Sequence, residues 1–145
     1  MQVTLWRLYR RTHGSGLDGK GGLYAEGRWH RLGSPVVYFG STASIVVLER
    51  LAHLDPEMLP DDLVLASFAA DLTVEHGGDA IDIHDLAQTQ PRGHQFLQDK
   101  ASCILAVASI LVPEEMNFVL NPSHPEAGSL RLRSEREFQF DSRLV

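Results

Sequence analysis

The chain has 145 residues, close to the commonest size for one domain, and 43% of them are hydrophobic. We therefore expect one folded domain over residues 1–145 rather than a disordered or multidomain protein. The net charge of −6 argues against general nucleic-acid binding, and no apolar run approaches the ~20 residues that span a bilayer. A single cysteine leaves no disulfide framework, and charges interrupt the N-terminus where a signal peptide needs an apolar stretch. We expect a cytoplasmic protein without membrane contact.

The charge is distributed unevenly along the chain. The first 35 residues hold six basic and two acidic residues, a net +4, and the remainder carries −10. A local basic segment on an acidic protein suits a small anionic ligand better than a polyanion. Chance clustering on a solvated face explains the same counts equally well.

The first half of the chain predicts two strands and one helix. Residues 3–9 alternate as a strand does, and a glycine-rich loop follows over 13–22. Residues 36–39 form a short β-branched and aromatic run typical of a buried strand. Ser41 or Thr42 then caps a helix that runs to about His53. Its expected apolar face carries Ile45, Leu48 and Ala52.

The second half predicts more strands than helices. We expect strands over 63–70, 102–107 and 117–120, a short helix over 93–101, and a closing strand or hairpin over 130–140. The stretch 72–90 mixes Gly, Asp and His and is expected to be mostly loop. Because strands and helices do not alternate, the pattern favours an α+β fold, with one small mixed sheet and flanking helices.

The glycine-rich loop contains the pattern G-x-G-x-x-G at Gly14, Gly16 and Gly19. That pattern binds a dinucleotide when a helix begins within it, because the helix N-terminus holds the pyrophosphate. Here further glycines and an expected strand follow. We therefore reject a Rossmann site and expect a mobile loop that closes over a ligand.

Metal and nucleophile motifs are missing from the sequence. The seven histidines form no HExxH motif, and the aspartates over 79–85 lack the spacing of a calcium loop. No G-x-S-x-G motif is present, and Cys103 lies in an expected buried strand, where an inert thiol is the better interpretation. We predict no metal site.

Three segments nevertheless combine into a family resemblance. They are GRWHRLGSPVVY at 27–38, VLERL at 47–51 and AVASILVPEEMNFVLNPSHP at 106–125. Together they resemble the RES-domain family, the toxin halves of bacterial toxin–antitoxin pairs, named after an arginine, a glutamate and a serine. The resemblance runs from Trp6-Arg7 to the final FQFDSRL.

The family's three residues match Arg28, Glu49 and Ser109 in this chain. The family usually has proline before its serine, and here Ala108 stands there. The backbone approach to Ser109 is therefore less constrained, which puts the role of this serine in doubt.

The resemblance implies a fold related to the ADP-ribosyltransferases and cleavage of the nicotinamide–ribose bond of NAD⁺, which is a substrate and not a cofactor. Glu49, Arg28 and Tyr38 are the expected catalytic residues. Glu49 would stabilise an oxocarbenium-like ribose, and Arg28 would hold the pyrophosphate. Tyr38 offers a ring for stacking and a hydroxyl for ribose or nicotinamide. Substrate contacts are also expected from Ser41 and Ser109.

The acceptor of ADP-ribose stays open between water, phosphate and a protein side chain. The resemblance also implies a type II antitoxin partner, often with a helix-turn-helix DNA-binding domain, and the complex could be oligomeric. Two other hypotheses remain. One is a catalytically inactive member that only binds its partner, and the other is a metal-dependent hydrolase that uses scattered histidines.

Overall fold

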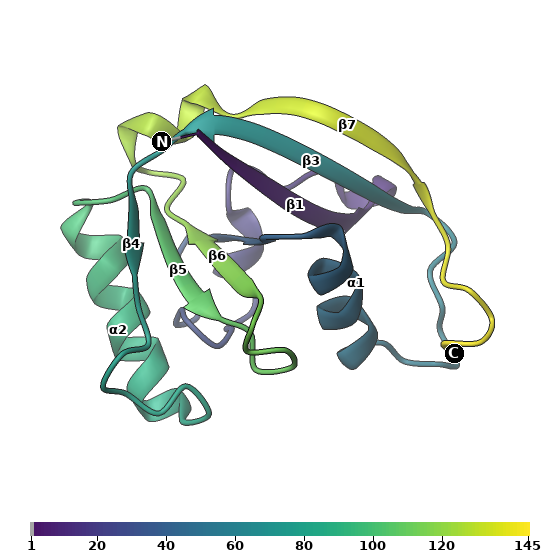
Figure 1. Ribbon diagram of the computed structural model, residues 1–145, viewed down its shortest axis with the longest axis horizontal. Coiled ribbons are helices and arrows are strands. Elements are labelled where there is room, and N and C mark those ends of the chain that lie inside the picture. The colour runs from purple at the N-terminus through teal and green to yellow at the C-terminus, as the bar shows by residue number, and fades with distance from the viewer. Residues whose placement is uncertain (1) are drawn as a thin grey trace.

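The alternating N-terminal residues form β1 (Gln2–Arg10), a central strand of one seven-stranded sheet. In the computed structural model, which describes residues 2–145, the strand order is β4-β5-β6-β2-β1-β3-β7 (Figure 1). The other strands are β2 (Val37–Gly40), β3 (Leu63–Asp71), β4 (Val74–His76), β5 (Ile104–Ala108), β6 (Met116–Leu120) and β7 (Arg131–Phe138). Only β4 and β5 pair in parallel. The predicted α+β fold with a mixed sheet is confirmed.

The sheet is weakly joined at its centre. Strand β1 pairs with β3 continuously from Gln2↔Asp71 to Arg10↔Leu63. With β2, in contrast, it shares the single pair Trp6↔Gly40. The two halves of the sheet diverge there, as the ribbon shows (Figure 1). Backbone groups of β2 beyond this pair must find other partners.

Helix α1 (Ala43–Ala52) lies beside β1 and β2 and forms as predicted. The side chain of Thr42 caps it by accepting a hydrogen bond from the backbone N–H of Ile45 at 3.2 Å. Ile45 is fully buried, but Leu48 is 38% exposed. Ala52 is exposed as well. The expected placement of Leu48 and Ala52 on the buried face is therefore wrong, because Val46 and Val47 make the contact with the core instead.

Helix α2 (Leu86–Asp99) begins well before the predicted residue 93. Asp85 caps it by accepting from the backbone N–H of Ala87 at 3.0 Å, and Pro91 lies inside the helix. The prediction of a loop over 72–90 is therefore partly wrong. Strand β4 lies near the start of this stretch, and the first turns of α2 lie at its end. Strand β4 has only three residues and exists through its pairing with β5, so its own sequence carries little signal.

The strand expected after the glycine-rich loop is absent from the described residues. The chain instead forms a short 3₁₀ helix over Lys20–Leu23 and an isolated bridge between Gly27 and His30. Gly19 adopts a left-handed φ of +74°, and a Cβ there would lie 2.7 Å from the backbone nitrogen of Val36. Glycine at this position thus allows the chain to turn and to pack closely against the backbone of Val36. Two further 3₁₀ helices span Arg11–His13 and Pro125–Ser129.

Helices α1 and α2 cover two different parts of the sheet. Beside α1, a cluster of Leu8, Leu63 and Leu65 forms the core. Beside α2, the core contains Trp29, Phe96 and the inward residues of β5 and β6. No helix among residues 2–145 is long and apolar enough to cross a membrane.

Candidate active site

The carboxylate of Glu49 is held by two donors from the neighbouring strands. Its Oε1 accepts a hydrogen bond from the Ser109 hydroxyl at 2.8 Å and another from the Asn117 side-chain amide at 2.9 Å. Within residues 2–145, Oε2 has no hydrogen-bond partner. Glu49 is only partly buried. One oxygen is therefore fixed and the other is left to receive a hydroxyl donor.

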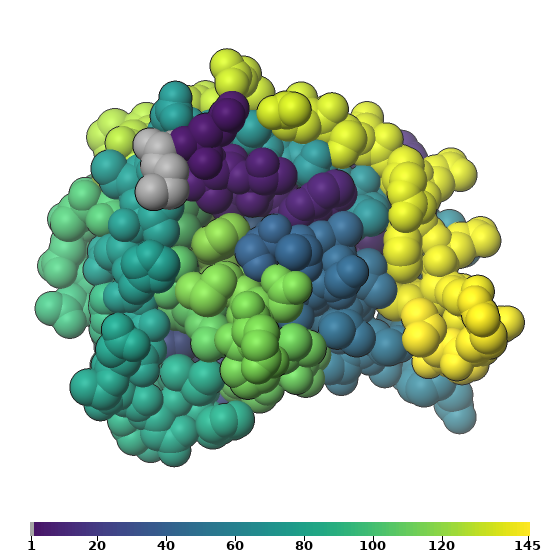
Figure 2. Space-filling model, in the orientation of Figure 1, coloured from purple at the N-terminus to yellow at the C-terminus, as the bar shows by residue number. Residues whose placement is uncertain are grey.

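Three elements meet to build this arrangement. Glu49 lies on α1, Ser109 directly follows β5, and Asn117 lies near the start of β6. Figure 2 shows α1, in blue, beside the green segment that connects β5 to β6. The pairing of β5 with β6 brings Ser109 close to Asn117, because the backbone of Ser109 bonds to Glu115 at 2.9 Å.

Ser109 is fully buried, and its hydroxyl makes three contacts. It donates to Glu49 and accepts from the backbone N–H groups of Leu111 at 3.1 Å and Val112 at 3.3 Å. A hydroxyl has one donor and two acceptor positions, so all three are used. In this structure Ser109 orients Glu49. The predicted contact of Ser109 with substrate would require one of these bonds to break.

Ser41 stabilises the turn that leads into α1. Its hydroxyl donates to a carboxylate oxygen of Glu115 at 3.2 Å and accepts from the backbone N–H of Met116 at 3.1 Å. Its own backbone N–H donates to the Met116 carbonyl at 3.0 Å. These bonds tie the start of β6 to the end of β2, close to Glu49. The predicted substrate contact of Ser41 stays a prediction.

Tyr38 lies on the same face of the sheet as Asn117, which bonds to Glu49. Gly40 pairs with Asn117, and Tyr38 precedes Gly40 by two residues, so Tyr38 and Asn117 face the same side. Two residues of a strand span roughly 7 Å. The Tyr38 hydroxyl accepts from the backbone N–H of Trp29 at 3.2 Å and lies 2.7 Å from Nδ1 of His30. Burial raises the pKa of Tyr38, so the phenol stays protonated.

Arg28 belongs to a loop that α2 holds in place. Its guanidinium donates to the Ile83 carbonyl at 3.0 Å, and its own carbonyl accepts from the Thr89 hydroxyl. Gly93 of α2 lies directly against this loop, because a Cβ there would be 1.7 Å from the Trp29 carbonyl oxygen. Thr89 and Gly93 of α2 thus fix the position of the loop that carries Arg28. The guanidinium keeps further donors for a ligand.

Arg7 is a candidate that the site predictions omitted. Its guanidinium donates to the Ser15 carbonyl at 2.7 Å and to the Tyr38 carbonyl at 2.8 Å, where β1 and β2 diverge. It also lies over the ring of Phe39, 5.9 Å from the centroid. Burial, together with the charge of Arg50, lowers the pKa of Arg7 to about 10. An arginine placed directly between Leu5-Trp6 and Leu8 in an expected strand is the sequence signal that could have found it.

Arg7 forms no salt bridge with a carboxylate anywhere in residues 2–145. A partly buried cation whose hydrogen bonds go only to neutral carbonyl oxygens among residues 2–145 is unusual, because burying an unpaired charge costs free energy. An anionic ligand would offset this cost. Arg7 is thereby a binding candidate beside Tyr38.

A second group of potential ligands lies at the opposite end of β6. Ligand atoms of Cys103, His124 and Glu126 approach within 4.8 Å of one another. However, His124 Nδ1 accepts from the backbone N–H of Glu126, and Glu126 accepts from both the backbone N–H and the hydroxyl of Thr73. Burial raises the pKa of the Cys103 thiol to about 12. These groups serve local structure, and the inert interpretation of Cys103 agrees with its complete burial.

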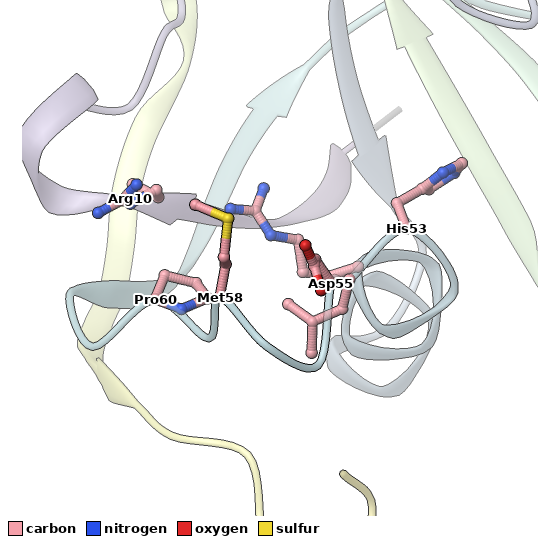
Figure 3. Close-up of a pocket in the computed structure, with 7 residues that line it drawn as sticks. Arg10, His53, Asp55, Met58 and Pro60 are labelled. Atoms are coloured by element: carbon pink, nitrogen blue, oxygen red, sulfur yellow. The ribbon is translucent and has the colours of Figure 1, made fainter.

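A shallow hollow lies at the C-terminal end of α1 (Figure 3). Its volume is about 230 Å³. It is lined by Arg10, Arg50, His53, Leu54, Asp55, Met58 and Pro60. None of the predicted catalytic residues lines it. Glu49 lies instead where α1 meets β5 and β6, and the Tyr38 hydroxyl contacts the loop that carries Arg28.

Comparison with known proteins agrees with these observations. The family model of the RES domain matches residues 4–141. A protein of Pseudomonas putida named Toxin Res is 37% identical, over 98% of this chain and 99% of that protein. The Prs ADP-ribosylating toxin of a Sphingobium species is 31% identical, over 100% of this chain and 98% of its own.

A solved structure also shares the fold. It is the MbcT-MbcA toxin-antitoxin complex of M. tuberculosis, with a TM-score of 0.77 at 17% identity, over 95% of this chain and 85% of the matched chain. At this identity the likeness concerns the fold alone.

Proposed function

The chain belongs to the RES domain family, and from this premise we propose that it is the toxin of a toxin–antitoxin pair and cleaves NAD⁺ at the nicotinamide–ribose bond. The observation that carries the proposal is the Glu49 carboxylate, fixed through Oε1 by Ser109 and Asn117 with Oε2 left unpartnered among residues 2–145. The names of the Pseudomonas and Sphingobium relatives support a toxin.

The chemistry of the bond explains why one carboxylate is enough. Nicotinamide leaves a pyridinium as a neutral molecule, so its departure needs no general acid. Positive charge develops on the ribose as in other glycosidic cleavages. Oε2 of Glu49 can accept a hydrogen bond from a ribose hydroxyl, while the negative charge of the carboxylate stabilises the developing cation. Because Ser109 and Asn117 hold the group beforehand, little reorganisation is needed during reaction.

The two arginines supply the anion-binding part of the site. Arg28 presents a planar fork that suits a pyrophosphate oxygen pair. Arg7 contributes a second, more deeply placed cation at the divergence of β1 and β2. Together they fit the positive charge of the first 35 residues.

A second candidate function is ADP-ribosylation of a specific cellular protein. The name of the Sphingobium relative, Prs ADP-ribosylating toxin, favours it. Both candidates use the same bond cleavage and differ in the acceptor, which is water or phosphate in the first and a protein side chain in the second. An inactive partner-binding member would show neither reaction. A metal-dependent hydrolase would lose its activity to a chelator.

The expected partner is a cognate antitoxin. The structure with the same fold was solved as a toxin-antitoxin complex. We expect part of the antitoxin, which would carry a helix-turn-helix domain, to cover the site near Arg28 and offer a carboxylate to its guanidinium. NAD⁺ and the antitoxin would then compete. If saturating NAD⁺ leaves the affinity for the antitoxin unchanged, occlusion of the site is wrong.

The test is product analysis with purified protein. NAD⁺ is incubated with the protein alone, with added phosphate and with cell lysate, and the products are identified by mass spectrometry. ADP-ribose, its 1″-phosphate and a modified protein distinguish the three acceptors. Glu49→Gln is the matched control, because it preserves shape. Absence of nicotinamide release under all conditions would contradict the proposal.

A cellular measurement complements the product analysis. Expression without the antitoxin should stop growth and lower NAD⁺ within the same period. Arrest with unchanged NAD⁺ would favour the protein-modifying candidate. Arrest that persists in Glu49→Ala would remove the proposed chemistry.

A further inference from the structure

His30 connects the Tyr38 hydroxyl to a backbone carbonyl. Nε2 of His30 lies 2.7 Å from the carbonyl oxygen of Ala25, and Nδ1 lies 2.7 Å from the Tyr38 hydroxyl. The same hydroxyl accepts from the backbone N–H of Trp29 at 3.2 Å. His30 is only 5% exposed. All three contacts of this short network are therefore held inside the protein.

These contacts determine where the protons lie. A carbonyl oxygen can only accept, so the bond to Ala25 requires a hydrogen on Nε2 of His30. The neutral ring carries a single hydrogen, which this bond places on Nε2. In the neutral ring Nδ1 is an acceptor. The Tyr38 hydroxyl must then donate its proton to His30.

These contacts fix the direction in which the Tyr38 hydroxyl donates its hydrogen bond. Its only hydrogen points to His30, and one of its two lone pairs receives the Trp29 N–H. One lone pair remains. Toward a ligand, this hydroxyl can accept a hydrogen bond but cannot donate one.

The backbone around His30 is shaped for this network. Gly27 and His30 form a bridge, with the Gly27 N–H bonded to the His30 carbonyl at 3.2 Å. A Cβ at residue 27 would lie 2.7 Å from the imidazole and 2.9 Å from the Tyr38 hydroxyl. The Gln90 side chain of α2 also bonds to the Gly27 carbonyl at 3.0 Å. The glycine of the GRWH segment is thus required by the close approach of His30 and Tyr38.

We propose that His30 is a positioning residue that makes the Tyr38 hydroxyl an obligate acceptor, and that this acceptor recognises the carboxamide N–H of nicotinamide. The inference rests on the proposed function. Glu49 takes the ribose hydroxyls from its place on α1, where Ser109 and Asn117 hold it. Tyr38 lies two strand residues before Gly40, the register partner of Asn117, so the nicotinamide ring falls on the Tyr38 side. Tyr38 is also packed against the apolar cluster around Trp29 and Phe96, which suits a flat aromatic ring.

The inference predicts a specificity. Nicotinic acid adenine dinucleotide carries a carboxylate in place of the carboxamide and offers no N–H donor. Its oxygens would face the lone pair of Tyr38 without a hydrogen between them. The protein should therefore prefer NAD⁺ over this acid analogue by about 10-fold in kcat/KM, the upper end of one lost hydrogen bond.

Two variants of His30 separate positioning from simple packing. In His30→Leu the Tyr38 hydroxyl is free to rotate and donate to a carboxylate, so the preference for NAD⁺ should fall about 10-fold, to near parity. His30→Asn places Oδ1 near the position of Nδ1 and keeps the acceptor for Tyr38, so the preference should be retained. Tyr38→Phe should lose the preference as His30→Leu does. An equal preference in wild type, His30→Leu and Tyr38→Phe would overturn the inference.

Two measurements do not depend on catalysis. Long-range ¹H–¹⁵N NMR of the wild-type protein reports the tautomer of His30, identified by the signal that His30→Asn removes. A hydrogen on Nε2 is expected, and a hydrogen on Nδ1 would overturn the inference. Calorimetry with the two dinucleotides gives the binding preference. If binding favours NAD⁺ but nothing is cleaved, the proposed function fails and the inference about His30 stands.

Discussion

The two ends of strand β6 carry asparagines of different purpose. At the first end, Asn117 is partly exposed, and its amide donates to the Glu49 carboxylate. At the other end, Asn121 is 2% exposed, and its amide donates to the Leu97 carbonyl of α2 at 3.0 Å. Its side-chain oxygen accepts from the backbone N–H of Ser123 at 3.0 Å. The first asparagine holds a carboxylate whose second oxygen has no hydrogen-bond partner among residues 2–145. The second asparagine bonds only to backbone groups.

His124 belongs to the structural end of the strand. Its Nδ1 accepts from the backbone N–H of Glu126 and caps the short helix that follows. The NFVLNPSHP segment of the family resemblance therefore combines one residue of the candidate site with several that fix the chain after it. A motif records which residues are needed together, but it does not distinguish chemistry from folding.

The largest expected effect concerns the carboxylate that Asn117 supports. Glu49→Gln keeps the shape and removes the negative charge that matters most in the transition state. We expect kcat to fall roughly 100- to 1000-fold, with NAD⁺ affinity nearly unchanged. Steady-state kinetics and calorimetry measure the two quantities separately. A near-normal kcat would mean that Glu49, and with it the Asn117 end, is only structural.

Arg28→Lys extends the comparison to the loop that α2 holds in place. Lysine keeps the charge but loses the planar fork, so we expect KM for NAD⁺ to rise about 10-fold while kcat changes little. The same kinetic series provides the measurement. If kcat collapses while binding is intact, Arg28 acts at the reacting centre and the division of roles is wrong.

Asn121→Ala tests the structural end of β6. It leaves the buried Leu97 carbonyl without its donor, so the free energy of unfolding should fall by about 1–3 kcal/mol. Denaturant titration measures the loss. The kcat of the folded fraction should stay at the wild-type value, and a selective loss of kcat would place this end in the mechanism.

Asn117→Ala is the matched substitution at the other end and has the smallest expected effect. It removes one of two donors to Oε1, and Ser109 still holds the carboxylate. We expect kcat to fall about 3- to 10-fold, with less than about 1 kcal/mol lost from stability because the site is partly exposed. The pattern should thus be the reverse of Asn121→Ala. Equal losses of stability in both variants would erase the distinction.

The sequence by itself determined the elements whose signals are local. The alternation of β1, the apolar runs of β5 and β6, and the Thr42 cap of α1 were all predicted within one or two residues. The non-alternating order of strands and helices predicted the α+β class that the structure confirms, and the family resemblance named Arg28 and Glu49. These features depend on neighbours in the chain, which a sequence displays directly.

Tertiary structure decided which groups meet. Strand β4 forms through its pairing with β5. Helix α2 begins at Leu86, although the mixed polar composition of this stretch predicted a loop. The convergence of Ser109 and Asn117 on one oxygen of Glu49 depends on the register of β5 with β6 and on the position of α1. Likewise, the obligate acceptor at Tyr38 exists only because His30 lies between it and a carbonyl. Hydrogen-bond direction follows from the partner present, and long-range partners are supplied by the fold rather than by the local sequence.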